Sequence, residues 1–409
     1  MNYRTYERGR DRADVQRIFR EVGWSKEGEE ETIDLFMEAD RTLIAHLDGE
    51  PVSVVSTAPG DIRYLRESLP LCVITSACTS RRARRQGLAK QLTAQAVAAA
   101  ALDGAQVAAL GAFDLGYYEK IGFGTLGYEH IVSFDPLRLN VQAKARVPRP
   151  LGRDDWQAVH AALLARARSH GSCSAYPPGL IRAEILSSDN GFGMGYCDGT
   201  GGELTHFVWF TAPNPISGPY RVKWLVYQNR EQFLELMALI GSLGDQVRGI
   251  TMREPAGIQL QDFLRWPIRH REMSEGSRYE NSMRALADGQ MRICDLPGCM
   301  ERTRLPWGEA RFNLRLSDPV ERLLDAQIPW RGAAGEYLVT LGASSGAERG
   351  VDAALPTLTA TVGAFTRMWL GVRPATGLAV TDALAGPPEL LHALDAVLRV
   401  PEPKTDWDF

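Results

Sequence analysis

The chain has 409 residues, of which 44% are hydrophobic and 23% charged, a composition typical of a soluble globular protein. Its formal net charge of −4 argues against a general nucleic-acid binder, and no apolar run of about 18 residues offers a membrane span. A chain of this length exceeds one ordinary hydrophobic core, so we expect two or three domains.

Residues 1–140 are predicted to alternate between helices and strands. Two alternating apolar segments around Asp48-Gly49 indicate a hairpin, because this dipeptide favours a tight turn. The predicted helices span 14–22, 31–39, 88–101 and 116–121, and the predicted strands span 42–46, 52–56, 71–79, 106–113 and a pair within 124–134. We assign this stretch to a first domain.

A second α/β unit is predicted over residues 141–288, where a proline-containing linker at 136–153 separates it from the first. Its predicted helices lie near 154–168 and 230–243, and its predicted strands near 193–196, 205–211, 220–226 and 247–252. The order strand, helix, strand repeats that of residues 71–113, which indicates a duplication. The matching turn, Tyr227-Gln228-Asn229-Arg230, contains no glycine, so we expect the second copy to be degenerate.

A third domain is predicted over residues 289–409. Short alternating segments at 291–295, 310–316 and 335–340 precede predicted helices over 356–365 and 388–398. Two prolines, Pro401 and Pro403, disrupt regular structure in the final segment. That segment contains Trp407 and Phe409, and such an aromatic end suggests that it is buried.

Six cysteines are scattered along the chain, at positions 72, 78, 173, 197, 294 and 299. None has the CxxC spacing, and the pair Cys294 and Cys299 has neither a nearby histidine nor a second pair of ligands. We therefore expect no metal site. Scattered cysteines in so long a chain suggest reduced thiols and a cytoplasmic protein.

The most informative segment is Arg84-Arg85-Gln86-Gly87-Leu88-Ala89, which joins the predicted strand at 71–79 to a predicted helix. The first-turn N–H groups of a helix have no partner inside it and point toward an anion, so such a turn suits a pyrophosphate. Gly87 lets the backbone come close to the phosphates. By itself the segment could equally be a basic surface turn, and the arginines at 81, 82, 84 and 85 could form a nucleic-acid patch.

A second segment, Tyr118-Glu119-Lys120-Ile121-Gly122-Phe123, follows about thirty residues later. With it, Thr79-x4-Arg84-x-x-Gly87-x-Ala89 resembles the acyl-CoA signature of GNAT N-acetyltransferases. The three-part chain ending in phenylalanine more narrowly resembles the Eis (enhanced intracellular survival) acetyltransferases. The resemblance covers the whole chain in organisation but is specific only over about 77–89, 111–124 and the final residues.

This resemblance implies an α+β fold. It has an N-terminal GNAT domain, a degenerate GNAT-like domain and a C-terminal sterol-carrier-like α/β domain. It implies acetyl-CoA as co-substrate, with the pantetheine arm on the strand edge at Ala77, Cys78 and Thr79. The pyrophosphate would be held by the turn residues already named, Arg84, Arg85, Gln86, Gly87, Leu88 and Ala89. Relatives of this kind assemble as hexamers, so a homo-oligomer is expected.

Tyr118 is the expected general acid. Acyl transfer to an amine must protonate a departing thiolate, and a tyrosine hydroxyl can supply that proton. The resemblance gives this role to Tyr118. The adjacent Tyr117 does not have the right spacing to Gly122 and Phe123. The alternative is a tyrosine that packs under a helix with its hydroxyl satisfied.

No histidine or glutamate in residues 1–140 stands out as the base that deprotonates the amine; His130 fits a partly buried structural histidine better. The resemblance implies that the terminal carboxylate does this work, which places the base at Phe409. A carboxylate with a pKa of about 3.5 is a weak base in water, so it would need burial or a water relay.

The acceptor site is expected to involve Trp24, Phe36 and Asp408. Seven acids within residues 25–40 could attract a polyamine or an aminoglycoside, or could form a solvated helix face. They are Glu27, Glu29, Glu30, Glu31, Asp34, Glu38 and Asp40. Arg81 stands where many GNAT chains have proline. Phe113 stands where the resembling family usually has a small polar residue, which puts broad aminoglycoside acceptance in doubt.

The sequence therefore predicts an acetyl-CoA-dependent N-acetyltransferase of a cationic amine, without a metal or a nucleic-acid or membrane partner. Alternative acceptors are protein, peptide or biosynthetic amines. A different class, a lipid carrier based on the third domain, is suggested by apolar residues such as Leu370 and Val372, which fit an ordinary core better.

Overall fold

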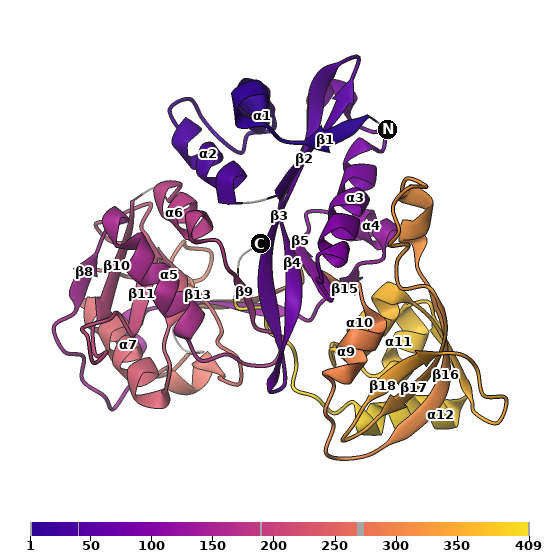
Figure 1. The fold of residues 1–409 in the computed structure, drawn as a ribbon. Helices are drawn as coiled ribbons and strands as arrows, with labels where there is room; N and C mark the ends of the chain where they lie inside the picture. The colour runs from indigo at the N-terminus through magenta and orange to yellow at the C-terminus, as the bar shows by residue number, and fades with distance from the viewer. Residues whose placement is uncertain (1, 40, 189, 268–273, 408–409) are drawn as a thin grey trace. The chain divides into compact units, whose positions relative to one another are not determined.

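The structure, a computed structural model, describes residues 2–39, 41–188, 190–267 and 274–407 (Figure 1). Within these residues the chain divides into two compact units. The first unit comprises residues 1–127, 169–177 and 287–409, and the second comprises 128–168 and 178–286. Among the described helices, none is both long and apolar enough to cross a bilayer.

The main sheet of the first unit has the strand order β1-β2-β3-β4-β5-β15-β6, with β9 also paired to β3. Its pairs are antiparallel except β4 with β5, which are parallel. The strands are β1 (Tyr3–Thr5), β2 (Arg41–Leu47), β3 (Glu50–Tyr64), β4 (Glu67–Thr79), β5 (Val107–Gly111), β6 (Gly124–Thr125), β9 (Cys173–Ala175) and β15 (Gly289–Ile293). The predicted hairpin is confirmed, since β2 and β3 meet at Asp48 and Gly49.

Four helices of the N-terminal part surround this sheet. They are α1 (Arg8–Val22), α2 (Glu30–Ala39), α3 (Leu88–Leu102) and α4 (Leu115–Tyr118). In α1 the apolar residues Val15, Ile18 and Phe19 recur at helical spacing, and all three are buried. The alanine-rich α3 is buried along its middle, from Leu92 to Ala98, so this helix is part of the core.

The position of β15 differs from the predicted domain boundaries. We expected a separate domain from residue 289 onward, but β15 pairs with both β5 and β6 in the N-terminal sheet. The boundary predicted near 140 also differs, because the strand β7 (Glu129–Phe134) belongs to the sheet of the second unit. Strand pairing between distant segments, rather than local composition, sets these boundaries.

The C-terminal part of the first unit has a sheet of its own, in the order β18-β17-β16-β19-β20. Its strands are β16 (Ala310–Ser317), β17 (Gly335–Leu341), β18 (Gly346–Arg349), β19 (Thr357–Thr361) and β20 (Leu384–Ala385), and its helices are α9 (Leu296–Glu301), α10 (Val362–Trp369), α11 (Ala375–Thr381) and α12 (Pro388–Val397). The helix predicted over 356–365 was wrong in its first half. Residues 357–361 alternate threonine with the buried Leu358 and Ala360, which is a strand pattern.

The second unit is built around the sheet order β14-β7-β13-β12-β11-β10-β8. Besides β7, its strands are β8 (Arg149–Leu151), β10 (Gly191–Tyr196), β11 (His206–Thr211), β12 (Tyr220–Val226), β13 (Ile250–Arg253) and β14 (Ser282–Leu286), and its helices are α5 (Trp156–Ala165), α6 (Pro178–Leu186) and α7 (Arg230–Ser242). The stretch predicted as a linker, 136–153, contributes β8 to this sheet.

The internal repeat is visible in the topology of both units. In each, a strand, a helix and a second strand parallel to the first follow one another, as β4-α3-β5 and as β12-α7-β13. In the second copy, Asn229 caps the helix by accepting a hydrogen bond from the N–H of Gln232 at 3.0 Å. The side chain thus occupies the helix N-terminus that the first copy leaves open.

Candidate active site

The two parallel strands β4 and β5 separate along their length. They pair only at Leu71, Cys72 and Val73, although β4 continues to Thr79. On its other side, β4 has a bulge opposite Ser56 and Thr57, which leaves Thr75 as the extra residue. The outer backbone edge of β4 is therefore open from Ile74 onward. This edge includes the predicted positions Ala77, Cys78 and Thr79, and it also includes the three residues before them, 74–76.

A cavity of about 190 Å³ lies at this opening. It is lined by Trp24, Ile74, Thr75, Ser76, Ala77, Leu110, Gly111, Ala112, Phe113, Tyr118 and Asp288. The Ser76 hydroxyl is buried and has no hydrogen-bond partner among the described residues. Since a buried polar atom without a partner costs free energy, it is suited to pair with a polar group of a bound molecule.

The turn after β4 has the geometry of an anion site. Gly87 has a φ of 77° and precedes the first residue of α3, so a side chain there would be strained. The first hydrogen bond of this helix runs from the N–H of Gln91 to the Gly87 carbonyl at 3.0 Å. The N–H groups before Gln91 consequently have no partner inside α3, and its N-terminus has no side-chain cap.

The arginines of this turn fall into two kinds. Arg82 pairs with Glu50 at 2.6 Å, which uses its charge within the protein. Arg84 and Arg85 are exposed and pair with no carboxylate among the described residues. Two free guanidinium groups beside a bare helix N-terminus suit a diphosphate, since both attract negative charge.

Tyr118 lines the cavity from the end of α4, with 9% of its surface exposed. Asp114 caps this short helix by accepting a hydrogen bond from the Gly116 N–H at 3.0 Å. Burial, and secondarily Cys78, raises the pKa of the Tyr118 hydroxyl. This hydroxyl has no hydrogen-bond partner in the described part of the chain. It is protonated at neutral pH and free to donate, as a general acid requires.

Two neighbours of Tyr118 are less suited to chemistry. Burial raises the pKa of Tyr117 to about 12, and this residue packs edge-on against Tyr118 without lining the cavity. Burial also raises the pKa of the Cys78 thiol to about 12, so it stays protonated and is a poor nucleophile. Of these three side chains, Tyr118 is therefore the one best placed to donate a proton into the cavity.

Comparison with known proteins agrees with this geometry. Residues 10–126 match the family model of the acetyltransferase (GNAT) domain. These residues form a GNAT acetyltransferase domain. They contain the open edge of β4, the turn at Gly87 and Tyr118, and they make the chain an acyltransferase. No curated protein matched the chain.

Solved structures resemble the chain over its whole length. Eis1 from Mycobacterium abscessus shares 16% identity, with full coverage of both chains and a TM-score of 0.77. A GCN5-related N-acetyltransferase from Kribbella flavida shares 17% identity, covering 100% of this chain and 98% of that one, with a TM-score of 0.76. A conserved protein of unknown function from Enterococcus faecalis shares 16%, with 100% and 99% coverage and a TM-score of 0.79. At these identities the likeness shows the fold alone.

Of the two described residues predicted for the acceptor site, Trp24 and Phe36, only Trp24 lines the cavity. Trp24 lines the cavity and packs against Phe19 and Phe113, at centroid distances of 5.8 and 6.1 Å. Phe36 is half-buried and packs on the core around Val15, and it is not one of the lining residues. Asp408 and Phe409 lie outside the described residues.

Three of the seven acids within residues 25–40 pair with arginines of α1. Asp34 binds Arg12 at 2.8 Å and also accepts from Gln16. Glu38 pairs with Arg8, and Glu30 with Arg20 at 3.1 Å. None of the described acids of this segment lines the cavity. Of the two readings left open, the structure therefore favours a helix face paired within the protein over an acceptor wall.

Asp288 is a lining residue that the sequence did not indicate. It directly precedes β15, and its carbonyl accepts a hydrogen bond from the Ala112 N–H at 2.7 Å. Gln290, the second residue of β15, donates a hydrogen bond at 3.4 Å to the carbonyl of Leu115, the first residue of α4. Residues far along the chain thus complete the GNAT site, and no local pattern around Asp288 signals this.

The described end of the chain is tied to the same sheet. The Cys173 N–H donates to the Thr405 carbonyl at 2.9 Å, and the Ser172 hydroxyl donates to Asp406 at 2.7 Å. Cys173 lies in β9, which pairs with Ile62 of β3. All six cysteines are free thiols, as the sequence suggested.

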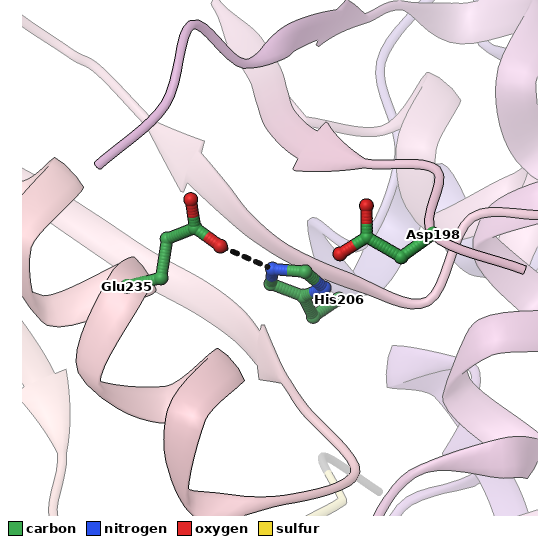
Figure 2. Close-up of side chains that lie close together, drawn as sticks. All are labelled: Asp198, His206 and Glu235. Carbon is green, nitrogen blue, oxygen red and sulfur yellow. Dashed lines mark hydrogen bonds and ion pairs between the residues drawn. The ribbon is translucent and has the colours of Figure 1, made fainter. Parts of the chain in front are cut away.

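A polar cluster in the second unit combines Asp198, His206 and Glu235 (Figure 2). Their donor atoms lie within 4.8 Å of one another, as in a metal site. Arg146, however, donates to Asp198 at 2.7 Å and to Glu235 at 2.8 Å. Arg146 lowers the pKa of Glu235 to about 2, while burial lowers the pKa of His206. The guanidinium is thus the cation of this cluster, which joins Arg146 to β11 and α7.

Proposed function

We propose that the chain is an acetyl-CoA-dependent N-acetyltransferase whose acceptor is a primary amine. The observation that carries this proposal is the cavity where β4 leaves β5, because Tyr118 lines it beside the open strand edge. Acetyl-CoA is the co-substrate, held along the β4 edge and at the turn of Arg84, Arg85 and Gly87. It supplies an activated acetyl thioester.

In the proposed reaction, the amine nitrogen attacks the thioester carbonyl and a tetrahedral oxyanion forms. Backbone N–H groups of the open β4 edge stabilise this negative charge. When the carbon–sulfur bond breaks, Tyr118 gives its proton to the thiolate, and the amide product and CoA thiol remain. Transfer is direct, which agrees with the raised pKa of Cys78.

The base in this proposal is the terminal carboxylate of Phe409, which takes the proton that the amine loses. Its support is the resemblance in sequence and the anchoring of Thr405 and Asp406 next to β9. Among the described lining residues of the cavity, Asp288 is the carboxylate that could compete for this role. To test this, a few residues are added after Phe409. Turnover should fall strongly, whereas the same extension before Met1 should have no effect. Full activity of the C-terminal extension would remove Phe409 from the mechanism.

Other features that the resemblance implies stay proposals. They are a cytoplasmic homo-hexamer and a sterol-carrier-like fold for residues 289–409, in which the sheet of β16 to β20 supports the catalytic part rather than carrying lipid. Native mass spectrometry tests the oligomeric state and the nature of the bound ligand together. Hexamers that retain CoA would support the enzyme, and retained lipid would favour the carrier.

The decisive experiment compares two neighbouring tyrosines. Tyr118→Phe should lower kcat about 10²- to 10⁴-fold while the Kd for acetyl-CoA stays nearly constant, because only proton donation is lost. Tyr117→Phe is the matched control and should keep most of its activity. Release of CoA thiol is followed with a panel of primary amines. Equal turnover of the two variants would contradict the proposed role of Tyr118.

A further inference from the structure

We infer that the acceptor carries a single ammonium group on an aromatic or apolar body, rather than several positive charges. This inference rests on the proposed function and narrows its substrate class. It combines three observations on the GNAT domain: three acids of the 25–40 segment are paired within the protein, one carboxylate lies in the cavity lining, and two aromatic rings of that lining are exposed.

Three of the acids that could attract a polycation, Glu30, Asp34 and Glu38, are paired with arginines of α1. Asp34 is in contact with Arg8, Arg12 and Gln16, and it is buried. A carboxylate surrounded by guanidinium groups has little attraction left for a polyamine, because the paired charges cancel at a distance. These three acids therefore contribute little attraction for a polycation.

The cavity itself offers one negative charge. Asp288 is the carboxylate among its described lining residues, and no lysine or arginine lies in that lining. The carboxylate of Asp288 has no hydrogen bond or ion pair with the described residues. The backbone of Asp288 is fixed by the bond from Ala112. One fixed carboxylate in a cavity of about 190 Å³ matches one ammonium group.

Two aromatic side chains at the same cavity are exposed. Phe113 is 90% exposed and Trp24 is 42% exposed, and their ring centroids are 6.1 Å apart at a tilt of 44°. Because neither ring is buried in a core, both expose apolar surface that a bound ligand can cover. Covering such a ring strengthens binding about 10-fold or more. An aromatic or alkyl body next to the ammonium group would gain this contact, whereas a hydrated polycation would not.

The test uses three amines of different shape with the full-length protein: 2-phenylethylamine, ethanolamine and spermidine. We expect kcat/KM for 2-phenylethylamine to exceed that for each of the other two by at least about 10-fold. Phe113→Ser should raise the KM for 2-phenylethylamine several-fold and leave the KM for acetyl-CoA unchanged. Ile216→Ser, which changes another highly exposed apolar residue outside the site, is the matched control.

Asp288→Asn should raise the KM for 2-phenylethylamine about 10-fold, because the ammonium group loses its charge partner. The outcomes separate the two proposals. If spermidine is the better acceptor, or if Phe113→Ser and Asp288→Asn leave every KM unchanged, the inference is wrong while the acetyltransferase function stands. If the protein binds acetyl-CoA but no amine causes release of CoA thiol, both the inference and the proposed function are wrong.

Discussion

A buried ion pair close to the segment that follows Tyr118 tests what stabilises the first unit. Arg292 of β15 and Asp318 have no exposed side-chain surface, and their closest N–O distance is 2.5 Å. Arg292 also donates to the carbonyl of Ile121, three residues after Tyr118. Asp318 accepts from the N–H groups of Val320 at 3.1 Å and Ala333 at 2.9 Å.

Removing one partner leaves the other charge buried without compensation. Arg292→Met or Asp318→Leu alone is expected to lower the free energy of unfolding by about 3–5 kcal/mol. That is a large share of the roughly 5–15 kcal/mol that stabilises a typical domain. The double variant removes both charges and should lose only about 1–3 kcal/mol, since the remaining cost is the unpaired Ile121, Val320 and Ala333 groups.

Urea denaturation of the four proteins measures these values, with CoA binding as the probe that reports on the first unit. The pair Arg315 and Glu336, at 3.1 Å and largely exposed, is the matched control and should contribute less than about 1 kcal/mol. If the single variants at Arg292 and Asp318 cost no more than this control, or if the double variant costs the sum of both, the reasoning fails.

Two further predictions concern packing and pH. Gly124→Ala should destabilise the first unit by about 1–3 kcal/mol and lower turnover, because its Cβ would lie 2.4 Å from the Gly363 carbonyl of α10; a neutral effect on thermal unfolding would refute the close packing. Arg146 lowers the pKa of Glu235 to about 2 from an unfolded value near 4.5, so this contribution to stability is present above pH 4.5 and is lost as the pH falls toward 2. Arg146→Met should therefore cost about 1 kcal/mol at pH 7 and almost nothing near pH 2, as measured by urea denaturation at both values; a cost that does not change with pH would contradict this.

Local features of the site could be predicted from the sequence because neighbouring residues determine them. Gly87 with its basic neighbours indicated a turn and a helix N-terminus, and the structure has both. The order strand, helix, strand of β4, α3 and β5, and its repetition in the second unit, followed from spacing, and the structure adds that the two strands of each repeat are parallel. The point where β4 leaves β5 could not be predicted, since it depends on the register between strands and on a bulge at Thr75.

The features that were missed depend on partners far away in the chain. The sequence could not decide whether Asp34 and Glu38 belong to an acceptor wall or to a helix face, because the arginines that pair with them lie on another helix. Residues 357–361 were assigned to a helix because the apolar helix that follows dominated the pattern. Asp288 had no local signal, because only the pairing of β15 with β5 brings it to the cavity.

The place of β15 between β5 and β6 has a consequence for how the protein is made. The ribosome synthesises β5 and β6 long before residue 289. Until β15 is made, the nascent sheet therefore lacks the strand that pairs with both of them. An unpaired strand edge of this kind can pair with other chains, so the sheet is open to aggregation until β15 is added. A recombinant fragment that stops near residue 140 would keep that gap permanently and would also end before Asp288.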